Sequence, residues 1–213
     1  MFFAGDTYNF ISGGWGPHST FYDPLNPKLH QRPYFWAVME EQVILVNEQD
    51  QVLGTMPKME AHEKARLHRA FSVFVLNHKG ETMLQQRAAH KYHSPGLWTN
   101  TCCSHQRVGE TNIQAGKRRL EEEMGFQTDL QDLFSFIYKA PFDNGLTEHE
   151  LDHVLLGHFE GEPNINPDEV ADWKWMGLEE IREDLEANPG AYTAWFRIIF
   201  ERFHNYVMTH NLK

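Results

Sequence analysis

Apolar segments separated by short polar turns predict two β-hairpins that begin shortly after residue 40. The segments QVILVN (42–47) and QVLGTM (51–56) are separated by a short polar turn, which is typical of two antiparallel strands. The segments AFSVFVLN (70–77) and ETMLQQR (81–87) flank His78-Lys79-Gly80, where glycine is expected to adopt the left-handed conformation that a tight hairpin turn requires.

Helical signals follow in the second half of the chain. Thr111 and Gln114 form a capping-box pattern and Gly125 follows the helical run, so a helix is predicted over residues 112–124. FSFIYKA (134–140) and ELDHVLLGHFE (150–160) read as strands, and 178–186 and 192–209 as helices. Strands and helices mix without a regular βαβ repeat. The pattern therefore favours an α+β protein, with a mixed β-sheet between helices in an α/β/α-like arrangement.

Residues 1–40 differ from the rest because they are rich in aromatic residues, glycine and proline and show no clear periodicity. We expect an irregular N-terminal extension there, followed by a single domain over residues 41–213. The extension either packs its aromatic side chains onto the domain or serves as a lid or a partner contact, and the sequence leaves both interpretations open.

Composition narrows the possible partners and compartments. No run of 18 apolar residues occurs, so membrane insertion is not expected. The net charge of −11 argues against nucleic acid and anionic membranes as partners, and an anionic substrate would need local cations or a metal. The two cysteines, Cys102 and Cys103, are adjacent and too few for a disulfide framework, and the N-terminus lacks a basic leader. A cytoplasmic location is therefore expected.

Three histidines and two carboxylates are candidate metal ligands. In a strand, residues two apart face the same side, so Glu148 and Glu150 would project together, as would Cys103 and His105. With His62 and His68 added, these nitrogen and oxygen donors would suit Mn²⁺, Mg²⁺ or Zn²⁺. The alternative is a set of unrelated surface groups, because the chain holds thirteen histidines.

The segment from Ser104 to Gly125 resembles the Nudix box, a loop–helix–loop whose carboxylates gather Mg²⁺ around a diphosphate. The matching residues are Glu110, Arg118, Arg119, Leu120, Glu122, Glu123 and Gly125. Two positions depart from the pattern: Ser104 stands where the box opens with glycine, and Arg119 replaces a glutamate. At helical spacing Arg119 and Glu123 are neighbours and could hold a diphosphate with its metal. A solvated helix with salt bridges would explain Arg118 and Glu122 equally well.

The segment WTNTCCSH (98–105), placed just before this box, resembles the active-site segment of type I isopentenyl-diphosphate isomerases, members of the Nudix superfamily. The resemblance runs from about residue 42 to the C-terminus and includes RLHRAF (66–71), Gln86-Arg87, EHE (148–150) and PDEV (167–170). It implies a Nudix fold and conversion of isopentenyl diphosphate into dimethylallyl diphosphate through a 1,3-allylic proton transfer.

The resemblance also implies roles for individual residues. Cys103 would be the acid–base thiol, with Cys102 facing the core, and Glu150 would act on the opposite side of the substrate with Tyr138 hydrogen-bonded nearby. It leaves open which side protonates the alkene. The implied metal ligands are His62, His68, His105, Glu148 and Glu150, and Glu123 would hold Mg²⁺ that arrives with the diphosphate. The implied substrate-binding residues are Lys58, Arg87, Lys91, Arg119 and Trp195, the last stabilising a carbocation.

Two other functions compete with this interpretation. A Nudix diphosphohydrolase acting on a nucleoside or prenyl diphosphate would share the scaffold but would use a full acidic box to activate water. A non-catalytic metal- or nucleotide-binding sensor would keep only the fold. Arg119 and the Cys103–His105 pair favour the isomerase, with a small prenyl diphosphate as substrate. We expect a monomer or a weak homodimer.

Overall fold

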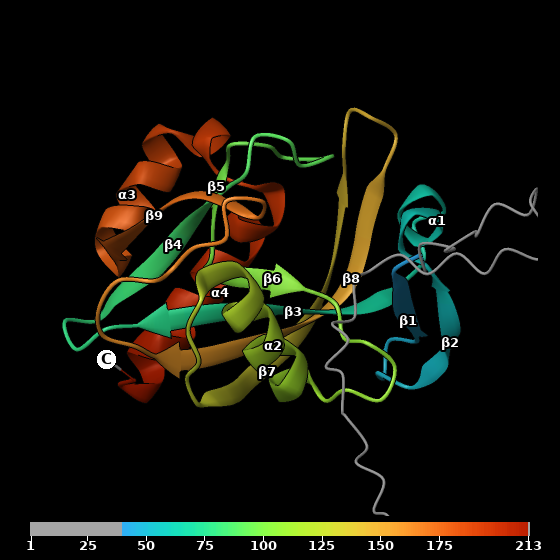
Figure 1. The fold of residues 1–213 in the computed structure, drawn as a ribbon, viewed down its shortest axis with the longest axis horizontal. Helices are drawn as coiled ribbons and strands as arrows, with labels where there is room; N and C mark the ends of the chain where they lie inside the picture. Colours follow the sequence, from blue (N-terminus) through green and yellow to red (C-terminus); the bar gives the residue numbers. More distant parts are fainter. Residues whose placement is uncertain (1–39, 213) are drawn as a thin grey trace, which may run out of the picture. The chain divides into compact units, whose positions relative to one another are not determined.

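Within residues 40–212, which the computed structural model describes, nine strands form one mixed sheet that is flanked by helices (Figure 1). The elements are, in order, β1 (Gln42–Val46), β2 (Val52–Pro57), α1 (Lys58–Glu63), β3 (His68–Leu76), β4 (Glu81–Arg87), β5 (Trp98–Thr99), β6 (Cys102–Ser104), α2 (Asn112–Met124), β7 (Leu130–Pro141), β8 (Thr147–His158), β9 (Val170–Gly177), α3 (Leu178–Ala187), the short 3-10 helix η2 (Pro189–Ala191) and α4 (Ala194–His210). The predicted N-terminal extension lies outside the described residues. Among the described helices, none is both long and apolar enough to cross a membrane.

Strand β3 is the centre of the sheet. It runs parallel to β8, with His68 opposite Glu150, and antiparallel to β6, with Ser72 opposite Cys103. It also pairs with β1 at one end and with β4 at the other, where Leu76 lies opposite Thr82. Side chains from segments that are far apart in sequence therefore lie close together around β3.

Alternation along β3 separates two hydrophobic cores. Phe71, Val73 and Val75 belong to the core that packs under α2, whereas Phe74 and Leu76 belong to the core formed with α3 and α4. Figure 1 shows α2 and α4 on opposite sides of the sheet. Because successive strand residues point to opposite faces, one apolar run serves both layers. This confirms the predicted mixed sheet between helices.

Strands β3 and β4 separate beyond their single paired position, and the chain around Thr101 fills the gap. The Thr101 hydroxyl accepts from the Val75 amide of β3 at 3.0 Å and lies 2.6 Å from the Met83 carbonyl of β4. The Asn100 side-chain amide donates to the carbonyls of Val73 and Cys102, at 3.2 and 2.7 Å. These buried polar groups satisfy backbone atoms that a continuous sheet would pair, and so keep the sheet open beside Cys103.

Helix α2 begins and ends as the sequence predicts. Thr111 and Gln114 form the reciprocal capping box, and Gly125 ends the helix with φ 69°. A Cβ atom at Gly125 would lie 2.2 Å from the Asn164 carbonyl oxygen, so glycine also permits the following loop to approach. The Asn166 amide donates to the Glu123 carbonyl at 2.9 Å and ties that loop to the helix.

Most predicted elements are confirmed, with shifts at their ends. The two hairpins, α2, α3, and strands β7 and β8 are present, and α4 begins at Ala194 because Thr193 caps it through the Phe196 amide. The sequence interpretation missed α1, β5, β6 and β9, which are short or lack an alternating pattern.

Candidate active site

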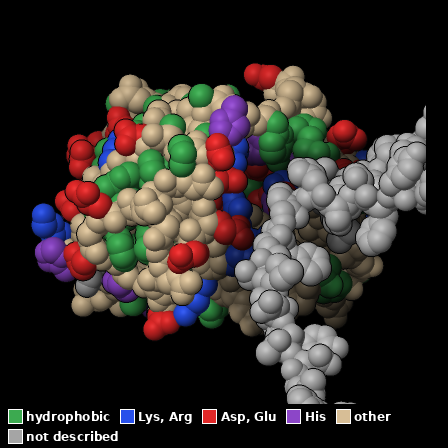
Figure 2. Space-filling view, in the orientation of Figure 1, with side chains coloured by type: hydrophobic (Ala, Val, Ile, Leu, Met, Phe, Trp, Pro, Cys, Tyr) green, Lys and Arg blue, Asp and Glu red, His purple; other side chains and the backbone are tan. Residues whose placement is uncertain are grey.

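One pocket collects nearly all the residues that the sequence singled out. It lies where β3 and β4 separate, and residues of α2 line it together with Trp195 of α4. Those that line it are Lys58, His62, Arg87, Lys91, Cys103, His105, Arg119, Glu123, Tyr138, Glu150 and Trp195. His68 and Glu148 lie directly behind this lining and contact it through Glu150 and Tyr138. Figure 2 shows acidic and basic side chains gathered together along the middle of the visible face.

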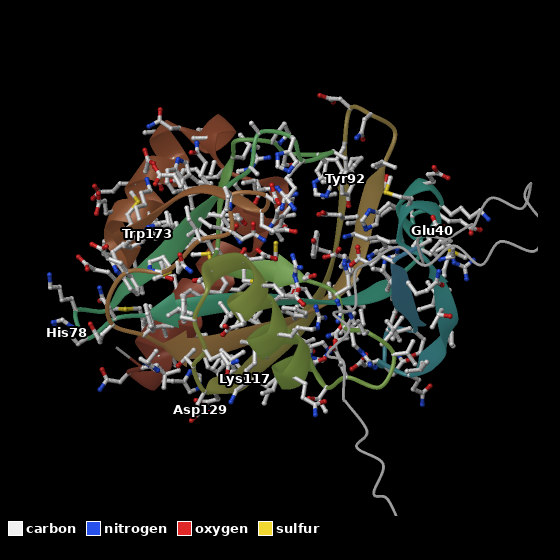
Figure 3. The ribbon with its side chains drawn as sticks, in the orientation of Figure 1. Glu40, His78, Tyr92, Lys117, Asp129 and Trp173 are labelled. Atoms are coloured by element: carbon white, nitrogen blue, oxygen red, sulfur yellow. The ribbon has the colours of Figure 1, made fainter. Side chains whose placement is uncertain are left out.

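The loop after β4 forms part of the pocket wall. Tyr92 and His93 of this loop line the pocket, and the Asn144 side chain of the β7–β8 hairpin lies 3.5 Å from the Tyr92 carbonyl (Figure 3). The His93 ring stacks on Phe142 with centroids 5.1 Å apart and meets the Trp195 ring edge-on at 5.6 Å. This wall is therefore aromatic, and its His93 and Trp195 rings are buried.

Four buried side chains converge at one end of the pocket. His62 comes from α1, His68 from β3, His105 from the segment after β6 and Glu150 from β8. Each offers one donor atom, and these atoms all lie within 4.8 Å of one another. The long-range pairing of β3 with β8 brings the carboxylate to the histidines.

The chemistry of these donors fits a divalent cation. His68 Nδ1 lies 2.8 Å from the Arg66 carbonyl, so it carries the proton and leaves Nε2 with a lone pair. That Nε2 faces His105 Nε2 at 3.2 Å, and His62 Nε2 is buried without a hydrogen-bond partner among the described residues. Burial, followed by the charges of His105 and His68, lowers the pKa of His62 to about 3. Neutral imidazoles and one carboxylate that face a common point are suited to a divalent metal.

Tyr138 lies between the two predicted carboxylate ligands. Its hydroxyl oxygen is 2.6 Å from Glu150 Oε2 and 3.0 Å from Glu148 Oε2, although it has only one proton to donate. Burial would raise the pKa of Glu150, but the hydrogen bond from His105 and the adjacent His68 ring hold it well below its usual range. Burial and the Glu150 charge raise the pKa of Glu148 well above its usual range. The single hydroxyl proton of Tyr138 therefore serves both carboxyl groups, and the contact with Glu150 is the shorter one. Glu148 lies outside the group of four donors, so its predicted role as a ligand stays a prediction.

Cys103 faces the pocket from the other flank of β3. It is partly buried, and burial raises the pKa of its thiol, so the protein without metal or substrate holds it protonated. Its neighbour on β3, Ser72, also lines the pocket and donates to the Asp152 carboxylate of β8 at 2.8 Å. Cys102 is fully buried in the core under α2, as predicted.

The predicted cations stand at the polar end of the pocket, and three of them already meet carboxylates. Lys58 pairs with Glu41 at 3.0 Å, while Lys91 and Arg119 both contact Glu169. Arg87 has no carboxylate partner among the ion pairs of the described residues, and its guanidinium lies 5.2 Å from the centre of the Trp195 ring.

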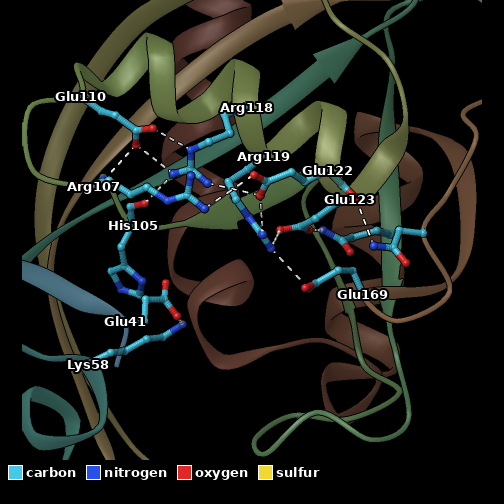
Figure 4. A network of polar contacts seen from close by, with 12 residues as sticks. Glu41, Lys58, His105, Arg107, Glu110, Arg118, Arg119, Glu122, Glu123 and Glu169 are labelled. Carbon is cyan, nitrogen blue, oxygen red and sulfur yellow. Dashed lines mark hydrogen bonds and ion pairs between the residues drawn. The ribbon is translucent and has the colours of Figure 1, made fainter. Parts of the chain in front are cut away.

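Helix α2 presents two arginines with different surroundings (Figure 4). Arg118 donates to Glu110 at 2.7 and 2.8 Å and to Glu122 at 3.2 Å, so the salt-bridge interpretation holds for it. Arg119 instead faces the pocket and pairs with Glu122 and Glu123. Burial would lower the pKa of Arg119, but the Glu123 charge raises it above its usual range. Glu123 also accepts from the Gln85 side chain at 2.9 Å, so it is held in place beside Arg119.

Sequence reasoning missed Gln85, His93 and Glu169 as lining residues. Gln85 sits next to the Gln86-Arg87 block and Glu169 lies inside the PDEV block, so both were within recognisable segments without an assigned role. His93 follows Lys91 in a loop without periodicity, and no pattern in a single sequence marks it.

The sheet between helices, with a charged helix at the mouth of its pocket, defines a NUDIX-domain protein. The profile described as "NUDIX domain" matches residues 66–196. Among solved structures, DR0079 from Deinococcus radiodurans superimposes with a TM-score of 0.64 at 23% identity, covering 76% of this chain and 98% of that one. A MutT protein from Methanosarcina mazei superimposes with a TM-score of 0.54 at 20% identity, covering 65% of this chain and 94% of that one. At these identities the likeness shows the fold alone.

Curated relatives narrow the class. The chain is 50% identical to "Isopentenyl-diphosphate Delta-isomerase 2" of Aromatoleum aromaticum, over 77% of this chain and 87% of that protein. It is 51% identical to the protein of the same name in Photorhabdus laumondii, over 76% and 91%. The chain therefore belongs to the isopentenyl-diphosphate Delta-isomerases of the NUDIX superfamily.

Proposed function

We propose that this protein interconverts isopentenyl diphosphate and dimethylallyl diphosphate by a 1,3-allylic proton transfer. One observation carries the proposal: Cys103 and the Tyr138–Glu150 pair line the same pocket from strands on the two sides of β3, next to a group of cations. An allylic rearrangement needs this combination, because one group must protonate the alkene and another must remove a proton from a different carbon.

The diphosphate would bind at the polar end of the pocket. Lys58, Arg87, Lys91 and Arg119 supply the positive charge that a protein of net charge −11 must concentrate locally. Glu123, buried beside Arg119, would hold Mg²⁺ that accompanies the diphosphate. The five-carbon end would then lie between Cys103 and Glu150.

The second group of donors would hold a divalent metal through His62, His68, His105 and Glu150, with Glu148 as a further ligand. Mn²⁺, Mg²⁺ or Zn²⁺ bound there would supply positive charge, and this charge would make a proton held at Glu150 more acidic. Tyr138 would hold the proton at Glu150 Oε2 in line with the substrate, over a contact of 2.6 Å.

Protonation of the alkene yields a tertiary carbocation, which water would quench. The wall of the pocket therefore matters as much as the acid. The Trp195 ring is buried, and it is closed in by His93, so its face can stabilise the cation while water is excluded. A thiol at Cys103 and a carboxylate at Glu150 can each take either the acid or the base role, and the product assay below does not depend on their order.

Incubation of the purified protein with isopentenyl diphosphate and divalent metal tests the proposal. Proton NMR should detect dimethylallyl diphosphate, and the Cys103→Ala variant should lose at least about a thousandfold in kcat while keeping its unfolding temperature. Cys102→Ala is the matched control, because that thiol points into the opposite core. Release of phosphate or pyrophosphate without dimethylallyl product would instead establish the diphosphohydrolase.

The diphosphohydrolase is disfavoured because Arg119 occupies a position where that chemistry needs a carboxylate, and because the curated relatives cited above carry the isomerase name. A cytoplasmic location is supported by the two free cysteines, and a monomer or weak homodimer remains our proposal for the assembly.

A further inference from the structure

Glu169 lies where the diphosphate is expected to bind, yet it carries negative charge. One of its carboxylate oxygens, Oε2, contacts Lys91 Nζ and lies 3.3 Å from Arg119 Nη2. Figure 4 shows the Arg119 guanidinium pointing to Glu169 from α2. Two cations from different elements thus share one carboxylate oxygen at the polar end of the pocket.

The backbone of Glu169 is fixed from both sides. Its carbonyl accepts from the Ala88 amide, directly after β4, at 3.0 Å, and its own amide donates to the Asn166 carbonyl at 2.9 Å. Asn166 is in turn bound to the last turn of α2 through Glu122 and Glu123. The backbone of Glu169 therefore sits at a set position between the strand that precedes Lys91 and the helix that carries Arg119.

The side chain of Glu169 retains freedom that its backbone lacks. It is 25% exposed, compared with 21% for Lys91 and 19% for Arg119, so the carboxylate can turn toward solvent while the cations stay in the pocket. The positive charges around it hold the pKa of Glu169 below its usual range despite its burial, so it is ionised at neutral pH. A diphosphate offers more oxygens and more negative charge to the same two cations than one carboxylate does.

We propose, on the basis of the function proposed above, that Glu169 is a positioning residue of the diphosphate subsite: it holds Lys91 and Arg119 together before substrate binds, and the diphosphate displaces it from both cations. The carboxylate keeps these two like charges side by side at the mouth of the pocket. Its displacement reduces the affinity for the diphosphate, which favours release of the equally charged product.

Binding of inorganic pyrophosphate, measured by calorimetry without metal, tests this inference independently of turnover. Glu169→Gln keeps the shape of the side chain and removes its charge, so we expect pyrophosphate to bind about three- to tenfold more tightly than to the wild type. KM for isopentenyl diphosphate should fall in parallel while kcat does not rise. Glu169→Asp, which restores the charge, should return the affinity toward the wild-type value.

Glu122→Gln is the matched control, because Glu122 also pairs with Arg119, at 2.8 Å, but does not contact Lys91 or line the pocket. Its affinity for pyrophosphate should stay within about twofold of the wild type. Unchanged or weaker pyrophosphate binding by Glu169→Gln would overturn the inference and leave the proposed reaction intact. A wild-type protein that neither binds pyrophosphate nor forms dimethylallyl diphosphate would overturn both.

Discussion

The hydroxyl of Tyr138 offers a sharp test of the acid–base arrangement. Replacing Tyr138 by phenylalanine removes one oxygen that lies 2.6 Å from Glu150 and 3.0 Å from Glu148. The ring should keep its place, because it is buried and stacks on Phe136 with centroids 5.8 Å apart. The substitution therefore isolates the hydrogen bonds from the packing.

The size of the effect follows from the charge of the acceptor. A hydrogen bond to an ionised group contributes about 1.5–3 kcal/mol, and about 1.4 kcal/mol corresponds to a factor of ten in rate. If Tyr138 aims the proton at Glu150, Tyr138→Phe should lower kcat about 10- to 150-fold. KM should change little, because the hydroxyl contacts Glu148 and Glu150 and not the cations proposed to bind the diphosphate. The buried carboxyl groups of Glu148 and Glu150 lose a hydrogen-bond partner, so stability should fall by about 1–3 kcal/mol.

Steady-state rates from proton NMR and unfolding midpoints in urea measure both quantities. Tyr206→Phe is the control, since Tyr206 makes its ring contacts with Phe134 and His210, away from the pocket. A folded Tyr138→Phe protein whose kcat stays within twofold of the wild type would refute the role of the hydroxyl. A rise in KM at constant kcat would place Tyr138 in substrate binding instead.

Two further predictions concern metal and pH. Removing divalent metal with a chelator should abolish activity and lower the unfolding temperature by about 5–10 °C, because a ligand at a hundred times its Kd stabilises by about 2.7 kcal/mol. The unfolding temperature of a His62→Ala variant should no longer depend on the chelator. Equal unfolding temperatures for the wild type with and without chelator would contradict the metal site. Hydrogen bonds from Arg118, opposed by partial burial, lower the pKa of Glu110 below 4.5 in the folded protein. The ionised carboxylate therefore stabilises the fold above that pH, and the effect is lost as the pH falls. Glu110→Gln should be less stable at pH 7 by up to about 1 kcal/mol in urea titrations, and the difference should close as the pH falls through the lowered pKa. A difference that persists in strong acid would disprove this linkage.

The sequence predicted those helices and strands whose conformation is determined by their own residues and near neighbours in the chain. The capping box of α2 and the apolar runs of β3 and β8 are visible in the local sequence, and these elements appear close to where they were expected. Strand β6 could not be predicted, because it spans only three residues. Its place depends on Asn100 and Thr101, whose side chains hydrogen-bond to backbone groups of β3 where β3 and β4 separate. Strand β9 is half exposed and rich in tryptophan, and its pairing with β4 decides its conformation.

The site was predictable as a set of residues but not as a geometry. Motif spacing and the family resemblance named the side chains that line the pocket, whereas the contact of Tyr138 with both glutamates depends on the register of β7 against β8. The role of Glu169 was not predicted, because it depends on a contact with Arg119 of α2, which is distant in sequence. Nothing in the sequence around Arg119 indicates that Glu169 is its partner.

The parallel pairing of β3 with β8 also sets the order in which the protein can be assembled. Ser72 and Asp152, which meet across these strands, are 80 residues apart in sequence, so the pairing closes a long loop and is slow to form. A nascent chain that ends after α2 already contains His62, His68 and His105 but lacks the carboxylate of β8. Complete ligation of a metal by these four residues thus becomes possible only after β8 has been synthesised, so capture of the ion would report that the β3–β8 pairing has formed.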